Sequence, residues 1–185
     1  MTLKNGTTFT GKIDPVTVNV QGGNTWNITA DSSGVDLNTS GTINFQKPSG
    51  DAYKNLVVQG DMANDRNGTA SGGGYTGTFS MNVSLADMAS DLITVRGDVS
   101  GSYKINFKTE EALQKSDQLR FSLLLVDVEG GNTGTAEGET EFNLFRGSVD
   151  IGMKTAQVQA GDHEGNNMED WFLVYDITNE GPASN

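Results

Sequence analysis

Cysteine is absent from this chain of 185 residues. Without thiols the protein can form no disulfide framework, no thiolate metal site and no cysteine nucleophile. Histidine is almost as scarce, because His163 is the only one, and this excludes a metal centre built from several histidines. No apolar run approaches the length that a membrane span requires, so we expect no membrane insertion.

Positive charge is also in short supply, since 12 basic residues face 24 acidic ones and the net charge is −12. The imbalance is concentrated in residues 121–185, which hold twelve acidic and two basic residues. Such a field repels phosphate backbones, which argues against nucleic acid as a partner. It is compatible with bound cations, with a basic partner surface, or with solubility alone.

Glycine is abundant, at 24 residues, and threonine, asparagine and serine occur throughout. This composition is typical of many short strands joined by tight turns. The longest apolar run lies in Gln118–Val128, which alternates at its start and is apolar on both faces in its middle. That pattern predicts a central strand covered on both sides, with Leu123 and Leu125 deeply buried.

Alternating segments separated by glycine and asparagine turns fill most of the remaining sequence, and the first 50 residues have the pattern of hairpins. Helical spacing occurs in Ser84–Leu92, and acidic residues after Thr109 predict a second helix over Glu110–Lys115. We therefore expect a mainly β fold, an antiparallel β-sandwich or flattened β-barrel with one or two short helices. A single domain should cover residues 1–179, followed by a frayed tail at 180–185.

A weak internal repeat runs through four segments: GTINF at 41–45, GTFSMNV at 77–83, GSYKINF at 101–107 and ETEFNLF at 139–145. Their starts are 24 to 38 residues apart, which is irregular for a solenoid. The favoured interpretation is sequential strands of one sandwich or barrel that share a turn chemistry.

Acidic loops rich in asparagine and glycine offer the oxygen ligands that calcium prefers. The candidate ligands are Asp61 and Asp65 in one loop and Asp162 and Glu164 in another. Neither loop has EF-hand spacing, so polar turns between strands remain the competing interpretation.

The sequence contains few residues in catalytic patterns. A Ser-His-Asp triad is not indicated, because no G-x-S-x-G motif is present, and His163 is expected to be a solvated loop residue. Glu137, Glu139 and Glu141 alternate as glycosidase carboxylates do on a strand, but no matching acid can be located. We expect no enzymatic activity and no cofactor, with calcium as the one ion to consider.

The leading functional hypothesis is a non-enzymatic structural protein that self-associates, such as a phage tail-tube or head-decoration component of a virion. The absence of cysteine, the Met start without a signal-peptide pattern and the strand-rich composition favour it. The alternative is a secreted or cell-surface adhesin or ligand-binding β domain that recognises a carbohydrate or a receptor and is stabilised by calcium. In either case, the apolar-poor loop Gly60–Gly74 is expected to contact the partner.

The charge distribution gives a direct prediction. The purified chain should not retard duplex DNA in a gel at about 50 mM salt, because its negative field opposes the phosphates. DNA binding that weakens steeply as salt rises would show that a basic surface dominates instead.

Overall fold

A computed structural model describes residues 1–47, 53–67, 74–108 and 114–177. These residues form two β-sheets and contain no α-helix. Within these ranges there is accordingly no helix long and apolar enough to cross a membrane. The predicted tail at 180–185 and most of the predicted helix at 110–115 lie outside the described residues.

The first sheet follows the order β1-β3-β6-β9-β13-β10-β7-β4-β2, with β16 joined to β13 and β11 joined to β10. Every pairing in it is parallel except that of the short β11 with β10. Its strands are β1 (Thr2–Leu3), β2 (Thr8–Thr10), β3 (Val18–Val20), β4 (Thr25–Ile28), β6 (Leu37–Thr39), β7 (Thr42–Phe45), β9 (Met62–Ala63), β10 (Thr76–Ser84), β11 (Ala89–Ser90), β13 (Val99–Lys108) and β16 (Thr133–Glu137).

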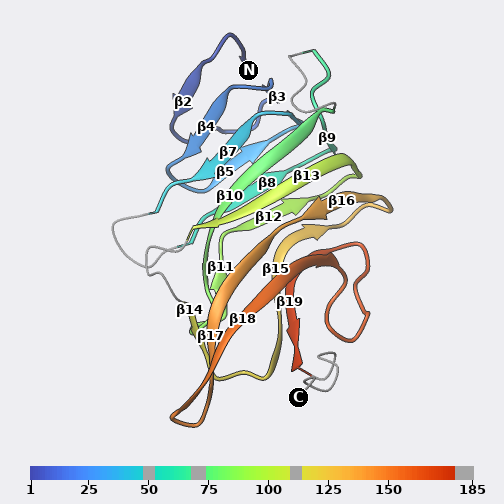
Figure 1. Ribbon diagram of the computed structural model, residues 1–185. Coiled ribbons are helices and arrows are strands. Elements are labelled where there is room, and N and C mark those ends of the chain that lie inside the picture. The colour runs from blue at the N-terminus through green and yellow to red at the C-terminus, as the bar shows by residue number, and fades with distance from the viewer. Residues whose placement is uncertain (48–52, 68–73, 109–113, 178–185) are drawn as a thin grey trace.

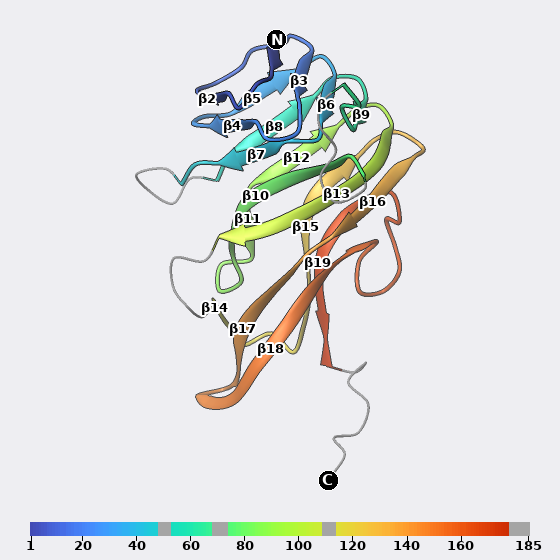
Figure 2. The same ribbon diagram turned by 45° about the horizontal axis from the view of Figure 1, so that its top comes forward.

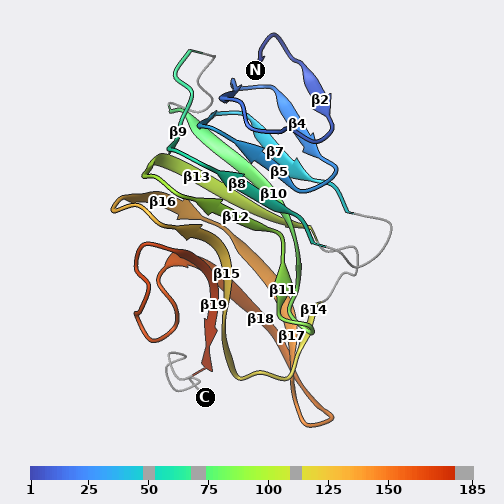
Figure 3. The ribbon, with the colours of Figure 1, turned by 180° about the vertical axis from the view of Figure 1, so that it is seen from behind.

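The second sheet follows the order β14-β17-β18-β19-β15-β12-β8-β5 and is parallel from β5 to β15 and antiparallel from β15 to β17. Figure 3 shows β5, β8, β12 and β15 side by side in that order. Its strands are β5 (Ser32–Gly34), β8 (Asn55–Val58), β12 (Leu92–Val95), β14 (Gln114–Ser116), β15 (Arg120–Val128), β17 (Glu139–Arg146), β18 (Val149–Ala160) and β19 (Trp171–Asp176).

The predicted antiparallel sandwich or barrel is wrong, because the chain winds as a three-sided parallel β-helix. Successive strands such as β4, β5 and β6 lie on different sides, and each pairs with the strand one coil further along. A parallel pairing needs a long connection, and one full turn of the coil supplies it. Short turns therefore mark the corners of a coil here, whereas the sequence interpretation took them for hairpins (Figure 1).

The internal repeat is the repeat of this solenoid. Thr8, Thr25 and Thr42 are register partners at intervals of 17 residues, and Thr78 and Lys104 continue the same column. The stacked segments are TWNI, TINF, TFSM and KINF, so three of the four segments that resemble one another are neighbours in space. The spacing is irregular because later coils contain longer connections between strands.

Inward side chains of these stacked strands form columns that fill the interior. One column runs from Phe9 through Trp26, Ile43 and Phe79 to Ile105, and all but Phe9 are buried. Each buried aromatic or aliphatic side chain of this size contributes about 1.5–3 kcal/mol through the hydrophobic effect. The Trp26 indole also donates a hydrogen bond to the Gly11 carbonyl at 3.0 Å, which ties the first coil to the second.

The C-terminal strands cover the other end of the column. Trp171 on β19 packs against Tyr103 with ring centroids 5.4 Å apart, and its indole nitrogen donates to the Thr133 carbonyl. Burial raises the pKa of Tyr103, whose hydroxyl donates to the Ser100 carbonyl. Antiparallel pairing of β15, β19, β18 and β17 thus extends the second sheet beyond the last coil, as Figure 2 shows.

The predicted central strand is confirmed. β15 lies inside its sheet, between β12 and β19, and Leu125 is fully buried while Leu123 is 6% exposed. It is the strand at which parallel coils give way to the antiparallel extension.

The helix predicted over Ser84–Leu92 is wrong. Ser84 does act as a cap, since the Asp87 amide donates to its hydroxyl at 3.2 Å. However, Met88 adopts a left-handed backbone (φ 51°), and Ala89 and Ser90 then pair back onto β10. The capping signal therefore closes a turn. In the second predicted helix, the described part is the strand β14.

The position of Leu125 makes core packing testable. Leu125→Ala should lower the free energy of unfolding by about 2–5 kcal/mol, because the cavity forms where the two parts of the sheet meet. Denaturant unfolding would measure the loss. Val149→Ala on β18, where the side chain is 64% exposed, should change it by no more than about 0.5 kcal/mol. A Leu125 loss below about 1 kcal/mol would contradict the burial.

Candidate functional site

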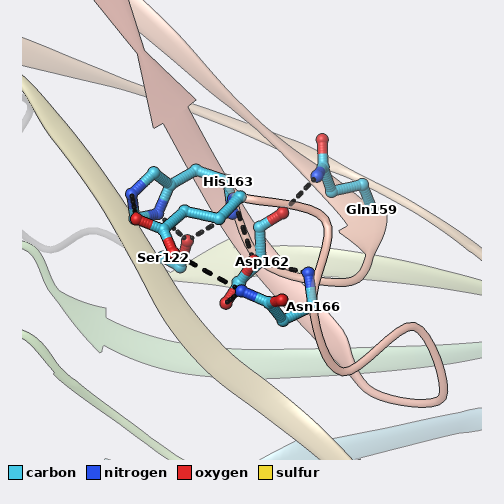
Figure 4. Close-up of polar contacts among 6 residues, drawn as sticks. Ser122, Gln159, Asp162, His163 and Asn166 are labelled. Carbon is cyan, nitrogen blue, oxygen red and sulfur yellow. Dashed lines mark hydrogen bonds and ion pairs between the residues drawn. The ribbon is translucent and has the colours of Figure 1, made fainter.

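The loop after β18 is organised by Asp162. Its carboxylate accepts hydrogen bonds from the backbone N–H groups of Asn166 and Glu164, each at 2.9 Å. These bonds, that from Asn166 foremost, lower the pKa of Asp162. Gln159 donates to the Asp162 carbonyl at 3.2 Å and joins the loop to the end of β18 (Figure 4).

His163 in this loop contacts Ser122 on β15. The serine Oγ lies 2.7 Å from His163 Nδ1 and also accepts the His163 backbone N–H at 2.8 Å, as Figure 4 shows. His163 is thus a loop residue, as predicted, but its side chain is only partly solvated, at 22% exposed. On its other side, Nε2 lies 3.9 Å from a Glu164 carboxylate oxygen, beyond hydrogen-bond distance. The two contacts between Ser122 and His163 hold the loop against β15.

The four predicted calcium ligands do not form one site. Asp162 and Glu164 lie together, and the Asn166 amide reaches both carboxylates at 3.4 Å. Asp61 and Asp65 serve separate turns, where they accept the N–H groups of other residues. Across the described ranges, no three His, Cys, Asp or Glu side chains form a group that could hold a metal ion. Calcium binding stays a prediction for both loops.

Asp61 belongs to a ladder of carboxylates along one corner of the β-helix. The Asp61 N–H donates to Asp36 at 3.0 Å, and the Asp98 N–H donates to Asp61 at 2.9 Å. Asp98 in turn accepts the N–H groups of Gly131 and Asn132. The hydrogen bond from Asn132, above all, lowers the pKa of Asp98. Each carboxylate thus binds the backbone of the next coil.

Glycine precedes each step of this ladder for a steric reason. A Cβ on Gly60 would lie 2.2 Å from an Asp36 oxygen, and one on Gly97 would lie 2.2 Å from an Asp61 oxygen. The Gly-Asp dipeptides at 60–61 and 97–98 are therefore corner motifs of the coil. The aspartates are 25 and 37 residues apart in the sequence. Because these two intervals differ, they do not predict that the aspartates stack on one another.

A buried carboxylate, Asp91, lies at another corner, between β11 and β12. It is fully buried and accepts the backbone N–H groups of Lys54 and Asn82 at 2.8 and 2.7 Å. Burial lowers the pKa of the neighbouring Lys108, while the charge of Asp91 acts to raise it. The Lys54 and Lys108 amines donate to the carbonyls of Gln46 and Phe45, respectively. Every group has a structural partner, so this network holds coils together.

The remaining candidate is a surface, which we call the outer face. It consists of the outward side chains of β2, β4, β7, β10 and β13, which Figure 1 shows side by side. They form two ranks along the axis, with neighbouring rungs about 4.8 Å apart. The first rank is Thr8, Thr25, Thr42, Thr78 and Lys104, and the second is Thr10, Asn27, Asn44, Ser80 and Asn106.

Hydrogen bonds between rungs fix the second rank. The Asn44 amide donates to Asn27 Oδ1 at 2.8 Å, and the Asn27 amide donates to Thr10 Oγ1 at 3.0 Å. A similar ladder joins Asn38 to Asn19 on another side of the β-helix. The outer face is therefore an ordered array of hydroxyl and amide groups. The sequence shows its alternation but not its stacking, so we did not predict it.

The protein is therefore a solenoid of the parallel β-helix class, with an antiparallel C-terminal extension. The Pertactin family profile matches residues 33–174, which is 142 of the 185 residues. The chain belongs to the Pertactin family. This family is one of adhesin-like proteins of the cell surface, so the comparison favours the adhesin hypothesis and an extracellular or cell-surface location over a virion component. No curated protein matches the chain.

The carboxylate ladder predicts a pH dependence. The folded-state pKa of Asp98 is lowered, so its ionised carboxylate stabilises the folded protein. This contribution to the free energy of unfolding is fully present above the unfolded pKa of about 3.9 and is lost as the pH falls through the folded-state pKa. Asp98→Ala should therefore lower the melting temperature at pH 6, and the gap to wild type should narrow below about pH 4. Asp14→Ala, at a carboxylate that is 73% exposed, is the control. A gap that is equal at pH 3 and pH 6 would contradict the ladder.

Proposed function

We propose that this chain is part of a cell-surface adhesin whose β-helix presents the outer face to a target surface. The observation that carries the proposal is a Pertactin-family β-helix in which a long sheet face displays ordered polar groups, uncharged from Thr8 to Ser80. Its role is binding and requires no catalytic residue. The net charge of −12 disfavours nucleic acid as the partner.

Rigidity supports this role. In a solenoid, each coil is held by its neighbours, so the positions of surface groups are set by the stack and not by mobile loops. The carboxylate ladder, the buried Asp91 network and the Asn44–Asn27 contact all join one coil to the next. A preorganised surface loses little entropy on binding, and this favours many weak contacts over a few strong ones.

Adhesion can be tested with beads coated with the purified chain and applied to epithelial cell monolayers under flow. Coated beads should be retained above albumin-coated beads, and Thr42→Glu on the outer face should reduce retention several-fold by placing a charge in the array. Ser33→Glu on β5 is the matched control, because Ser33 lies outward on the second sheet. Both variants should unfold at temperatures close to wild type.

Retention equal to that of albumin-coated beads would overturn the adhesin proposal. Equal loss in the two glutamate variants would show that general negative charge, and not the outer face, controls adhesion.

A further inference from the structure

A groove lies at the end of the outer face, where the chain leaves the β-helix. It has a volume of about 450 Å³ and lies between β13, the junction of β16 with β17, and β18. This volume falls within the range of small-molecule sites. The polar side chains that line it are Lys104, Asn106, Glu137, Glu139 and Gln157.

The change of sheet at Gly138 creates this groove. Lys104 faces Glu137 across the β13–β16 pair, and Glu139 faces Gln157 across the β17–β18 pair. Gly138 between them packs so closely on β13 that a Cβ there would lie 2.3 Å from the Ile105 carbonyl oxygen. Its own carbonyl accepts the Val158 N–H at 2.9 Å. Two cross-strand pairs are thus fixed on either side of a glycine floor.

The groove continues the ranks of the outer face. Lys104 is the register partner of Thr78, and Asn106 is the partner of Ser80. A linear ligand that lies along the axis would therefore contact the hydroxyl and amide array and end among the charged groups of the groove. The two features form one surface.

The groups in the groove fit hydroxyls better than ions. An ammonium donates, carboxylates accept, and amides do both, whereas a hydroxyl can both donate and accept. Hydrogen bonds from ligand hydroxyls to Glu137 and Glu139 would be charge-assisted and therefore strong. A phosphate or sulfate would face the two carboxylates and the negative field of the protein, and a bare cation would face Lys104.

The outer face also disfavours a folded protein as the ligand. Protein interfaces centre on aromatic, methionine and arginine anchors. The two ranks from Thr8 to Ser80 contain threonine, asparagine and serine only, with no charge and no large apolar group. In a chain of net charge −12, this neutral stretch matches an uncharged, hydroxyl-rich polymer.

We propose that the outer face and the groove at its end bind a neutral polysaccharide chain lying along the β-helix axis. This inference rests on the proposed adhesin function and names the chemistry of its target. The ladder of amides supplies regularly spaced hydrogen bonds, and the groove fixes one end of the saccharide.

Affinity electrophoresis of the full chain through gels containing dextran, mannan, galactan or a mixed-linkage β-glucan tests the proposal. At least one neutral polymer should retard the protein, whereas heparin should not. The double variant Asn27→Ala/Asn44→Ala should weaken the retarding interaction about tenfold or more, since two or more hydrogen bonds are lost. The matched variant Asn19→Ala/Asn38→Ala breaks the equivalent ladder elsewhere and should stay within about twofold of wild type.

A groove variant, Lys104→Ala/Gln157→Ala, gives an independent readout that leaves the asparagine ladders intact. It should also weaken binding about tenfold. The proposal is overturned if no neutral polymer retards the chain, if heparin or a lysine peptide binds instead, or if both asparagine variants lose binding equally. Bead retention on cells without polysaccharide binding would refute this inference and leave the adhesin function standing. Polysaccharide binding without bead retention would support this inference and overturn the adhesin function.

Discussion

Hydrogen bonding between each strand and the strand one coil further along is the constraint on which the rest of this structure depends. In that arrangement, an inward side chain always stacks on an inward one, and an outward side chain on an outward one. The column from Phe9 to Ile105 and the ranks that begin at Thr8 and Thr10 are two consequences of the same register. The corners obey it too, because each aspartate of the ladder accepts a backbone N–H group of the following coil.

Two tryptophans, one towards each end of the described stack, join neighbouring segments through packing and hydrogen bonds. Trp26 and its hydrogen bond to Gly11 secure the N-terminal coils, and Trp171 packs on Tyr103 below the last ones. A second aromatic group, in which Phe121 and Phe142 lie 5.4 Å apart and Tyr175 lies 5.0 Å from Phe142, fills the antiparallel extension.

Local structure was largely predictable and pairing was not. Alternation located most strands, and the apolar run in Gln118–Val128 identified an interior strand, because burial on both faces leaves a direct trace in composition. The only sequence feature that indicates which strands pair with one another is the internal repeat. That repeat was seen in GTINF, GTFSMNV and GSYKINF, but unequal connections between coils made its spacing irregular, and the fourth segment, ETEFNLF, belongs to the antiparallel part.

In the candidate sites, too, contacts between residues close in sequence were predictable and contacts between distant residues were not. Asp162 and Glu164 are close in sequence, and their association was predictable from turn chemistry. The Asp36–Asp61–Asp98 ladder, the pairing of Ser122 with His163 and the groove beside Lys104 join residues about 25 to 50 positions apart, so they follow only from the coil register and the final extension.

The interval of 17 residues between Thr8, Thr25 and Thr42 has a consequence for how such a molecule changes over generations. Duplication of one such unit would add a coil and lengthen the molecule by about 4.8 Å without altering the register of any other coil. The larger intervals to Thr78 and Lys104 show that extra sequence can enter at a corner while the column continues. Length and corner decoration can therefore vary independently, and the pattern of exposed hydroxyls and amides is inherited with every added coil.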